Sequence, residues 1–173
     1  LYEDVFKKAL YEVGLLWETN KITVATEHLA TAITEGILNE LYAELDIQEN
    51  QNNKVILTCV ENEIHQVGIK MVADVFEMHG WDSYFIGTGI PTSELVQFIK
   101  QEKPNILAIS MSIFFNYQNL VRMIEVLKNE FPDLTVIVGG QAFVHKKEGI
   151  YTKIDGVKYI ADLYELDNYL KSN

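Results

Sequence analysis

Cysteine, positive charge and long apolar runs are all scarce in this chain of 173 residues. The single cysteine, Cys59, excludes a disulfide framework within the chain, and we expect a reducing, cytoplasmic location. Only 14 Lys and Arg stand against 25 Asp and Glu, which gives a formal net charge of −11. Such a surface repels phosphate groups, so this segment is a poor candidate for binding nucleic acid or an anionic membrane. No apolar run approaches the roughly 20 residues that a membrane-spanning helix needs.

The sequence also lacks internal repeats, low-complexity segments and, at its start, a methionine or a signal pattern. We therefore expect the chain to be an excised part of a longer protein. Apolar residues make up 48% and charged residues 23%, as in an ordinary globular protein, so the chain can bury a real core.

A polar, unpatterned stretch over residues 46–53 divides the chain and is predicted to be a linker. Before it, apolar residues recur at helical spacing in two segments, which predicts amphipathic helices that pack together. Thr23 is placed to cap the second helix, with Glu27 in its first turn. We expect a helical bundle domain over residues 1–48, forming a four-helix cap, and a second domain over residues 54–173.

The second domain alternates between strand and helix patterns. Strands are predicted over residues 54–60, 81–87, 105–112, 134–140 and 157–161. Helices are predicted over residues 68–80, 91–102, 117–131 and 162–171. Repeated β-α units with almost wholly apolar strands build parallel sheets that are covered on both faces. We therefore predict an α/β fold, flavodoxin-like or Rossmann-like, with a parallel five-stranded sheet flanked by helices.

Polar or small residues follow three of the predicted strands, at the edge where open parallel sheets bind ligands. In chain order they are Glu63, Ile64, His65, Gln66, Val67 and Gly68, then Ser110, Met111 and Ser112, then Gly139 and Gly140. Each group alone is a weak signal, since a polar loop histidine is more often solvated than bound to a metal. Together they mark one sheet edge, with small residues where a ligand can approach the backbone closely.

The order and spacing of these groups resemble the cobalamin-binding domain family, whose pattern is Asp-x-His-x-x-Gly, then Ser-x-Leu, then Gly-Gly. The resemblance implies that cobalamin binds base-off, with His65 on the cobalt in place of the cofactor's benzimidazole. It also implies that Glu63 hydrogen-bonds the other ring nitrogen, while glycine and serine leave room for the nucleotide tail. Two positions depart from the pattern, because Glu63 replaces Asp and Ser112 replaces Leu.

The helical segment carries Trp17 and, after nine intervening residues, Glu27 and His28. This spacing resembles the helical cap of the adenosylcobalamin-dependent photoreceptor regulators, which are MerR-type repressors. The resemblance implies that Trp17 packs against the adenosyl group and that Glu27 contacts the adenosine, with His28 beside it. Periodicity alone would place Trp17 in a helical core and leave His28 solvated. In the photoreceptors a histidine that binds cobalt after illumination follows the tryptophan, whereas here that residue is Glu18.

We therefore expect a non-enzymatic sensory module that binds adenosylcobalamin and transmits light or the cofactor state to transcription. Its expected partners are cobalamin, a further copy of the chain and a DNA-binding domain elsewhere in the full-length protein. Three alternatives stay open: a corrinoid carrier protein in methyl transfer, a haem-binding sensor on the same fold, and a domain that binds nothing and only mediates protein contacts.

The other reactive and aromatic side chains are assigned from their context. Cys59 lies inside a predicted strand and is expected to be a small buried apolar residue. His79 stands at a predicted helix end and is interpreted as structural, and His145 is interpreted as solvated. Three aromatic residues after the third strand either line the site or pack in the core: Phe114, Phe115 and Tyr117.

Overall fold

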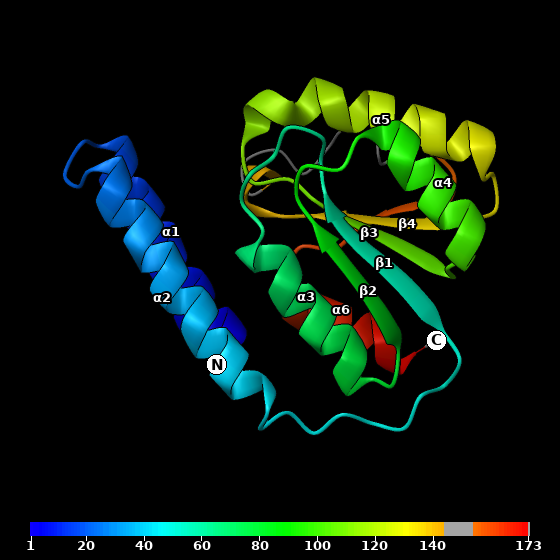
Figure 1. Cartoon of the computed structure of the whole chain (residues 1–173), viewed down its shortest axis with the longest axis horizontal. Coiled ribbons are helices and arrows are strands. Elements are labelled where there is room, and N and C mark those ends of the chain that lie inside the picture. Colours follow the sequence, from blue (N-terminus) through cyan, green and yellow to red (C-terminus); the bar gives the residue numbers. More distant parts are fainter. Residues whose placement is uncertain (144–153, 173) are drawn as a thin grey trace. The chain divides into compact units, whose positions relative to one another are not determined.

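A computed structural model gives the fold and describes residues 1–143 and 154–172 (Figure 1). The chain divides into two compact units, Leu1–Asp46 and Ile47–Asn173. The division falls at the start of the polar stretch that the sequence marks as a linker.

The first unit is a helical hairpin. A π-helical turn, η1 (Tyr2–Phe6), runs into α1 (Lys7–Glu18), and α2 (Val24–Tyr42) packs against α1. The side chain of Thr23 accepts a backbone N–H bond from the first turn of α2, which confirms the predicted cap. Residues 1–46 thus hold two α-helices instead of the four expected, because only two segments carry an apolar stripe of helical period.

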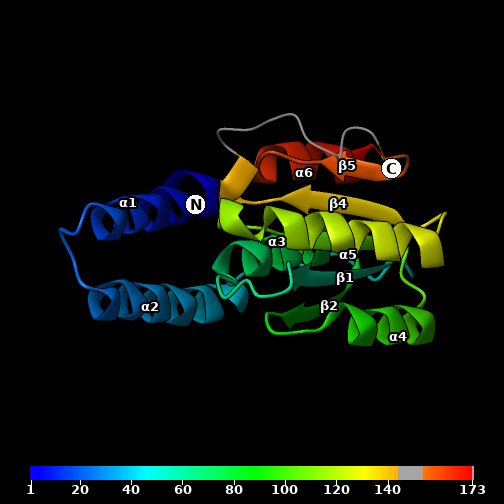
Figure 2. The same ribbon diagram turned by 90° about the horizontal axis from the view of Figure 1, so that it is seen from above.

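The second unit contains a parallel sheet of five strands in the order β2-β1-β3-β4-β5. Figure 2 shows β2 beside β1 and β4 beside β5. The strands are β1 (Lys54–Cys59), β2 (Asp82–Gly87), β3 (Ile106–Ser110), β4 (Thr135–Gly139) and β5 (Val157–Tyr159). The helices are α3 (Val67–Met78), α4 (Thr92–Glu102), α5 (Tyr117–Glu130) and α6 (Leu163–Lys171), with short 3₁₀ turns η2 (Phe114–Asn116) and η3 (Gln141–Phe143). These elements confirm the predicted order of strands and helices and the predicted fold class.

Helices cover both faces of this sheet, with α4 and α5 on one side and α3 and α6 on the other (Figure 1). Alternate residues of β1 serve the two layers, since Val55 and Leu57 pack with α3 and α6 while Ile56 packs with α4 and α5. Burial on both faces explains why most residues of the central strands are apolar. No helix within residues 1–143 and 154–172 combines the length and apolar character needed to cross a membrane.

The carboxyl ends of the strands meet at one edge because every pairing in the sheet is parallel. Cys59, at the end of β1, lies opposite Ser110 at the end of β3, and Ser110 lies opposite Gly139 of β4. The loops that follow β1, β3 and β4 therefore start side by side. This register brings the three groups of candidate residues to the same edge.

Candidate functional site

The carboxylate of Glu63 is the centre of the site. It belongs to the loop between β1 and α3, and the residue is only 1% exposed. Its Oε1 atom lies 2.5 Å from Nδ1 of His65 and accepts backbone N–H bonds from Ile64 at 3.1 Å and His65 at 3.3 Å. The contact expected between the acid and the histidine two residues later is therefore present, and it fixes the direction of the imidazole ring.

The second oxygen of Glu63 joins this loop to the loop after β3. Oε2 accepts backbone N–H bonds from Ser112 and Ile113, each at 3.0 Å, and a bond from Nδ2 of Asn116 at 3.2 Å. Asn116 is 6% exposed and directly precedes α5. Because the donors come from two separate loops, one buried carboxylate holds both of them in place.

These hydrogen bonds decide the protonation state of Glu63. Burial alone raises the pKa of this carboxyl, but the bond with the His65 ring and the N–H groups of Ile113, Ser112 and His65 outweigh burial and lower the pKa to about 2. Glu63 is therefore a carboxylate at neutral pH and can only accept hydrogen bonds, so Nδ1 of His65 carries the proton in their contact. Nε2 is then the ring nitrogen whose lone pair suits a metal, and 39% of the His65 side chain is exposed.

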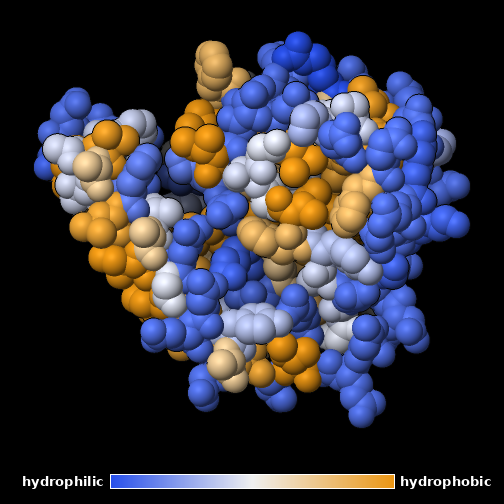
Figure 3. Space-filling model, in the orientation of Figure 1, coloured by the Kyte–Doolittle hydropathy of each residue, from blue (hydrophilic) through white to orange (hydrophobic). Residues whose placement is uncertain are grey.

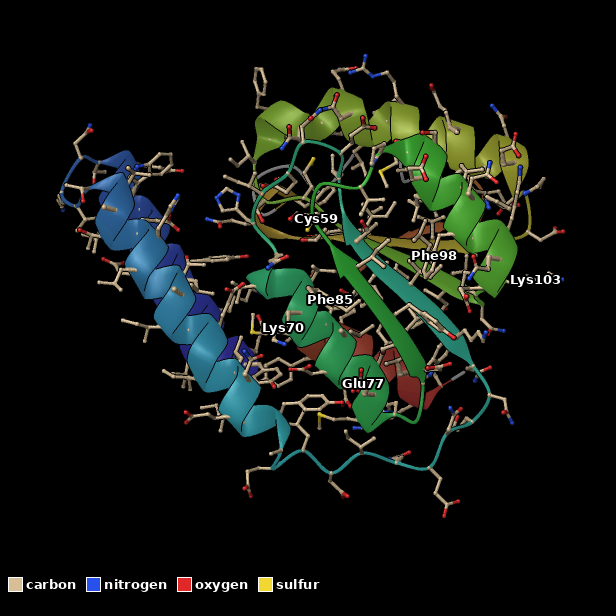
Figure 4. All side chains as sticks on the ribbon, in the orientation of Figure 1. Cys59, Lys70, Glu77, Phe85, Phe98 and Lys103 are labelled. Carbon is tan, nitrogen blue, oxygen red and sulfur yellow. The ribbon has the colours of Figure 1, made fainter. Side chains whose placement is uncertain are left out.

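Cys59 contacts the loop between β1 and α3 from the interior of the protein. This residue, labelled in Figure 4, ends β1 and is 2% exposed, as expected for a buried small residue. Its thiol donates a hydrogen bond to the backbone oxygen of His65 across 3.3 Å. Burial and the nearby charge of Glu63 raise the pKa of the thiol to about 12, so it stays protonated and able to donate.

The predicted glycines divide into two kinds. A Cβ atom added to Gly68 would meet no other atom within 4 Å, so this glycine borders open space. At Gly139 the added Cβ would lie 2.9 Å from the backbone oxygen of Ile160, and at Gly140 it would lie 2.4 Å from that of Met111. The chain's own backbone occupies the space beside Gly139 and Gly140, so packing at the end of β4 already requires both glycines.

The other predicted contacts differ in exposure. Val67 and Met111 are 6% and 0% exposed, so both side chains belong to the core. Gln66 stands at the N-cap of α3, and its Oε1 atom lies 2.7 Å from where a Cβ atom added to Gly87 would be. Ile64 is 70% exposed and is the apolar member of the loop that a ligand can reach.

Nothing in the sequence indicates the role of Asn116, and the sequence leaves open whether Phe114 and Phe115 lie at the site. Asn116 precedes a helix, a position that usually indicates an N-cap, yet its side chain bonds Glu63. Four apolar residues next to these contacts form what we call the apolar rim, namely Ile64, Ile113, Phe114 and Phe115, with exposures of 70%, 40%, 43% and 92%. Figure 3 shows apolar side chains protruding near the start of α5, where this rim lies. Exposed apolar residues beside a half-exposed histidine suit a large, flat and partly apolar ligand.

The predicted residues of the helical unit gather near its hairpin turn. Trp17 lies in the last turn of α1 and is 43% exposed, and Glu18 ends the same helix. Glu27 lies in the first turn of α2, where its carboxylate contacts Nδ1 of His28 and accepts a hydrogen bond from Thr31 at 2.9 Å. The indole and the carboxylate are therefore held by neighbouring ends of two helices within one unit.

The remaining histidines lie apart from Glu63. Nε2 of His79 lies 2.9 Å from a carboxylate oxygen of Asp167, which links the end of α3 to α6 and confirms the structural interpretation. His145 falls outside the described residues. Across the parts of the chain that the structure describes, no three His, Cys, Asp or Glu residues gather to form a metal cluster. His65 offers one nitrogen, which suits a metal whose other ligands come from a macrocycle.

Residues 53–162 match the family described as B12 binding domain, and residues 1–42 match a second family with the same description. Dimethylamine corrinoid protein 1 of Methanosarcina mazei is 25% identical over 81% of this chain and 67% of its own length. The HTH-type transcriptional repressor CarH of Myxococcus xanthus is 24% identical over 82% of this chain and 47% of its own length.

The fold also matches a solved structure. The monomethylamine corrinoid protein of Methanosarcina barkeri superposes with a TM-score of 0.80 over 95% of this chain and 78% of that chain. The sequence identity is 16%, so the likeness concerns the fold.

Proposed function

The chain belongs to the B12 binding domain family and binds cobalamin, and we propose that it is a corrinoid carrier that holds methyl groups for transfer between methyltransferases. The observation that carries the site assignment is the buried Glu63 carboxylate with Nδ1 of His65 at 2.5 Å. This corresponds to the alternative that the sequence left open, rather than to the sensory module that it favoured.

Two observations support a carrier over a light sensor. Dimethylamine and trimethylamine corrinoid proteins recur among the relatives of this chain. In addition, Glu18 occupies the position where the photoreceptor pattern has a second cobalt-binding histidine. A carboxylate is a poorer ligand for cobalt than imidazole, so the bis-histidine state of a light sensor has no basis at that position.

The described residues fit cobalamin at the carboxyl edge of the sheet. His65 would hold the cobalt through Nε2, while Glu63 fixes the ring and makes it more basic through Nδ1. Gly68 borders open space beside the loop, and the exposed apolar rim offers side chains that a corrin ring can cover. Bound cobalamin supplies a cobalt centre that can accept and release a methyl group.

An adenosylcobalamin-responsive regulator is the second candidate. The spacing of Trp17, Glu27 and His28 favours it, as does the similarity to the repressor. In that role the helical unit would respond to the upper ligand of cobalt, and a DNA-binding domain outside this chain would read the response.

The two candidates differ in cofactor preference and in response to light. We would titrate the purified chain separately with methylcobalamin and adenosylcobalamin, and measure its mass in the dark and after illumination. A carrier binds methylcobalamin at least as tightly as adenosylcobalamin and keeps the same mass after illumination. Strong preference for adenosylcobalamin, with a light-dependent change of mass, would replace the carrier with the regulator.

A further inference from the structure

Glu61, two residues before Glu63, links the loop between β1 and α3, which carries His65, to the start of α4. Its Oε2 atom accepts a hydrogen bond from the hydroxyl of Thr92 at 2.7 Å and one from the backbone N–H of Thr92 at 3.3 Å. Pro91 is the N-cap of α4 and makes no side-chain cap bond. Glu61 therefore caps α4 from a distant part of the chain, with its negative charge at the positive end of the helix dipole.

The backbone of Glu61 is held as well, by the first turn of α5. Its carbonyl oxygen accepts a hydrogen bond from Nδ2 of Asn119 at 3.2 Å. The Oδ1 atom of Asn119 accepts a bond of 2.6 Å from Arg122, which fixes the direction of the amide. Glu61 thus contacts both α4, which follows β2, and α5, which follows β3.

We propose that Glu61 is a positioning residue that holds the loop so that His65 is aimed before cobalamin arrives. This inference rests on His65 being the cobalt ligand. Glu63 sets the direction of the ring, while Glu61 sets the position of the backbone that carries both residues. The backbone between them makes a tight turn, with Asn62 at a φ of 71° and the N–H of Glu63 bonded to the oxygen of Val60 at 2.9 Å.

Holding the loop in advance matters because ordering a flexible segment on binding weakens affinity. Substitution of groups that directly orient a metal-binding histidine typically weakens metal binding about 10- to 100-fold. Glu61 acts one step further out, so we expect a smaller effect, a roughly 3- to 10-fold rise in the Kd for cobalamin.

The test compares Glu61→Ala, Thr92→Val and the double variant with a matched control, Asp162→Ala. Asp162 is also a carboxylate cap, accepting the backbone N–H of Glu165 at 2.8 Å at the start of α6, and it takes no part in the site. For each variant we would measure the melting temperature, the Kd for hydroxocobalamin and the NMR signals of the His65 ring in the cofactor-free protein.

If Glu61 positions His65, Glu61→Ala and Thr92→Val raise the Kd and shift the His65 signals, and the double variant is no worse than Glu61→Ala alone. The control then lowers the melting temperature without either effect. Unchanged Kd and His65 signals in Glu61→Ala, with a melting temperature lowered as in the control, would reduce Glu61 to a helix cap. His65→Ala serves as the reference, because wild-type affinity in that variant would overturn the ligand assignment itself.

Discussion

Nδ1 of His65 and Oε1 of Glu63 lie 2.5 Å apart, and the carboxylate end of this pair is buried while the imidazole reaches the surface. The two residues therefore differ in solvent exposure, which suits an acid that orients and a histidine that binds a ligand. The acid is fixed by donors from two loops and cannot turn toward solvent. The histidine is oriented from inside the protein and presents its other nitrogen at the surface.

Replacing Glu63 by Gln tests the carboxylate. The amide nitrogen of Gln would face N–H donors whichever way it turns, so at least one buried donor loses its partner. We expect a loss of roughly 3 kcal/mol in the free energy of unfolding at neutral pH, because several bonds to a charged acceptor are weakened together. Chemical denaturation measures this loss, and a variant as stable as the wild type would mean that the network adds nothing to stability.

The same carboxylate predicts how stability depends on pH. The pKa of Glu63 is lowered from 4.5 to about 2, so the unfolded chain binds more protons than the folded chain between these values. The contribution of Glu63 is complete above pH 4.5 and is lost as the pH falls toward 2, with a total of about 3 kcal/mol. Denaturation curves of wild type and Glu63→Gln should converge over this interval. Parallel curves would show that the folded-state pKa is not lowered.

Asn116 gives a test of charge next to Glu63. Asn116→Ala removes one donor and should cost about 1–2 kcal/mol. Asn116→Asp keeps the shape but places a second acceptor 3.2 Å from Oε2, the distance of the present bond, and should cost more than the alanine variant at neutral pH. In acid the difference in stability between the two variants should narrow or reverse, because the added carboxyl becomes protonated and can donate a hydrogen bond. Equal stability of the two variants at neutral pH would argue against the contact.

The sequence predicts the scaffold well because its signals are local. Apolar runs identify the buried strands. The contact between Glu63 and His65, which are two residues apart, is implied by the resemblance to the cobalamin-binding pattern. Asn116 could not be found this way, because its partner Glu63 is 53 residues away and its local context resembles a helix cap. Gly139 and Gly140 match a family pattern, but only the structure shows that the oxygens of Ile160 and Met111 take up the space beside them.

Gly68 and Gly140 should respond in opposite ways to alanine. Gly68→Ala adds a methyl group where nothing lies within 4 Å, inside a helix, so stability should stay the same or rise by up to about 1 kcal/mol while the affinity for cobalamin falls. Gly140→Ala meets the Met111 oxygen at a φ of +114° and should destabilise the fold by more than about 1 kcal/mol. Thermal melts and cobalamin titration of both variants check this, and unchanged affinity in Gly68→Ala would place the ligand elsewhere.

The central claim, that His65 binds cobalt in place of benzimidazole, is tested most directly by electron paramagnetic resonance. Cobalamin in its paramagnetic cobalt(II) form would be bound to the chain carrying ¹⁵N at histidine only, and to the unlabelled chain. A coordinated nitrogen splits the cobalt lines into triplets when it is ordinary nitrogen and into doublets when it is ¹⁵N. We predict doublets in the labelled protein and their loss in His65→Ala, whereas triplets that persist despite the label would mean that benzimidazole stays on the cobalt and would contradict the account.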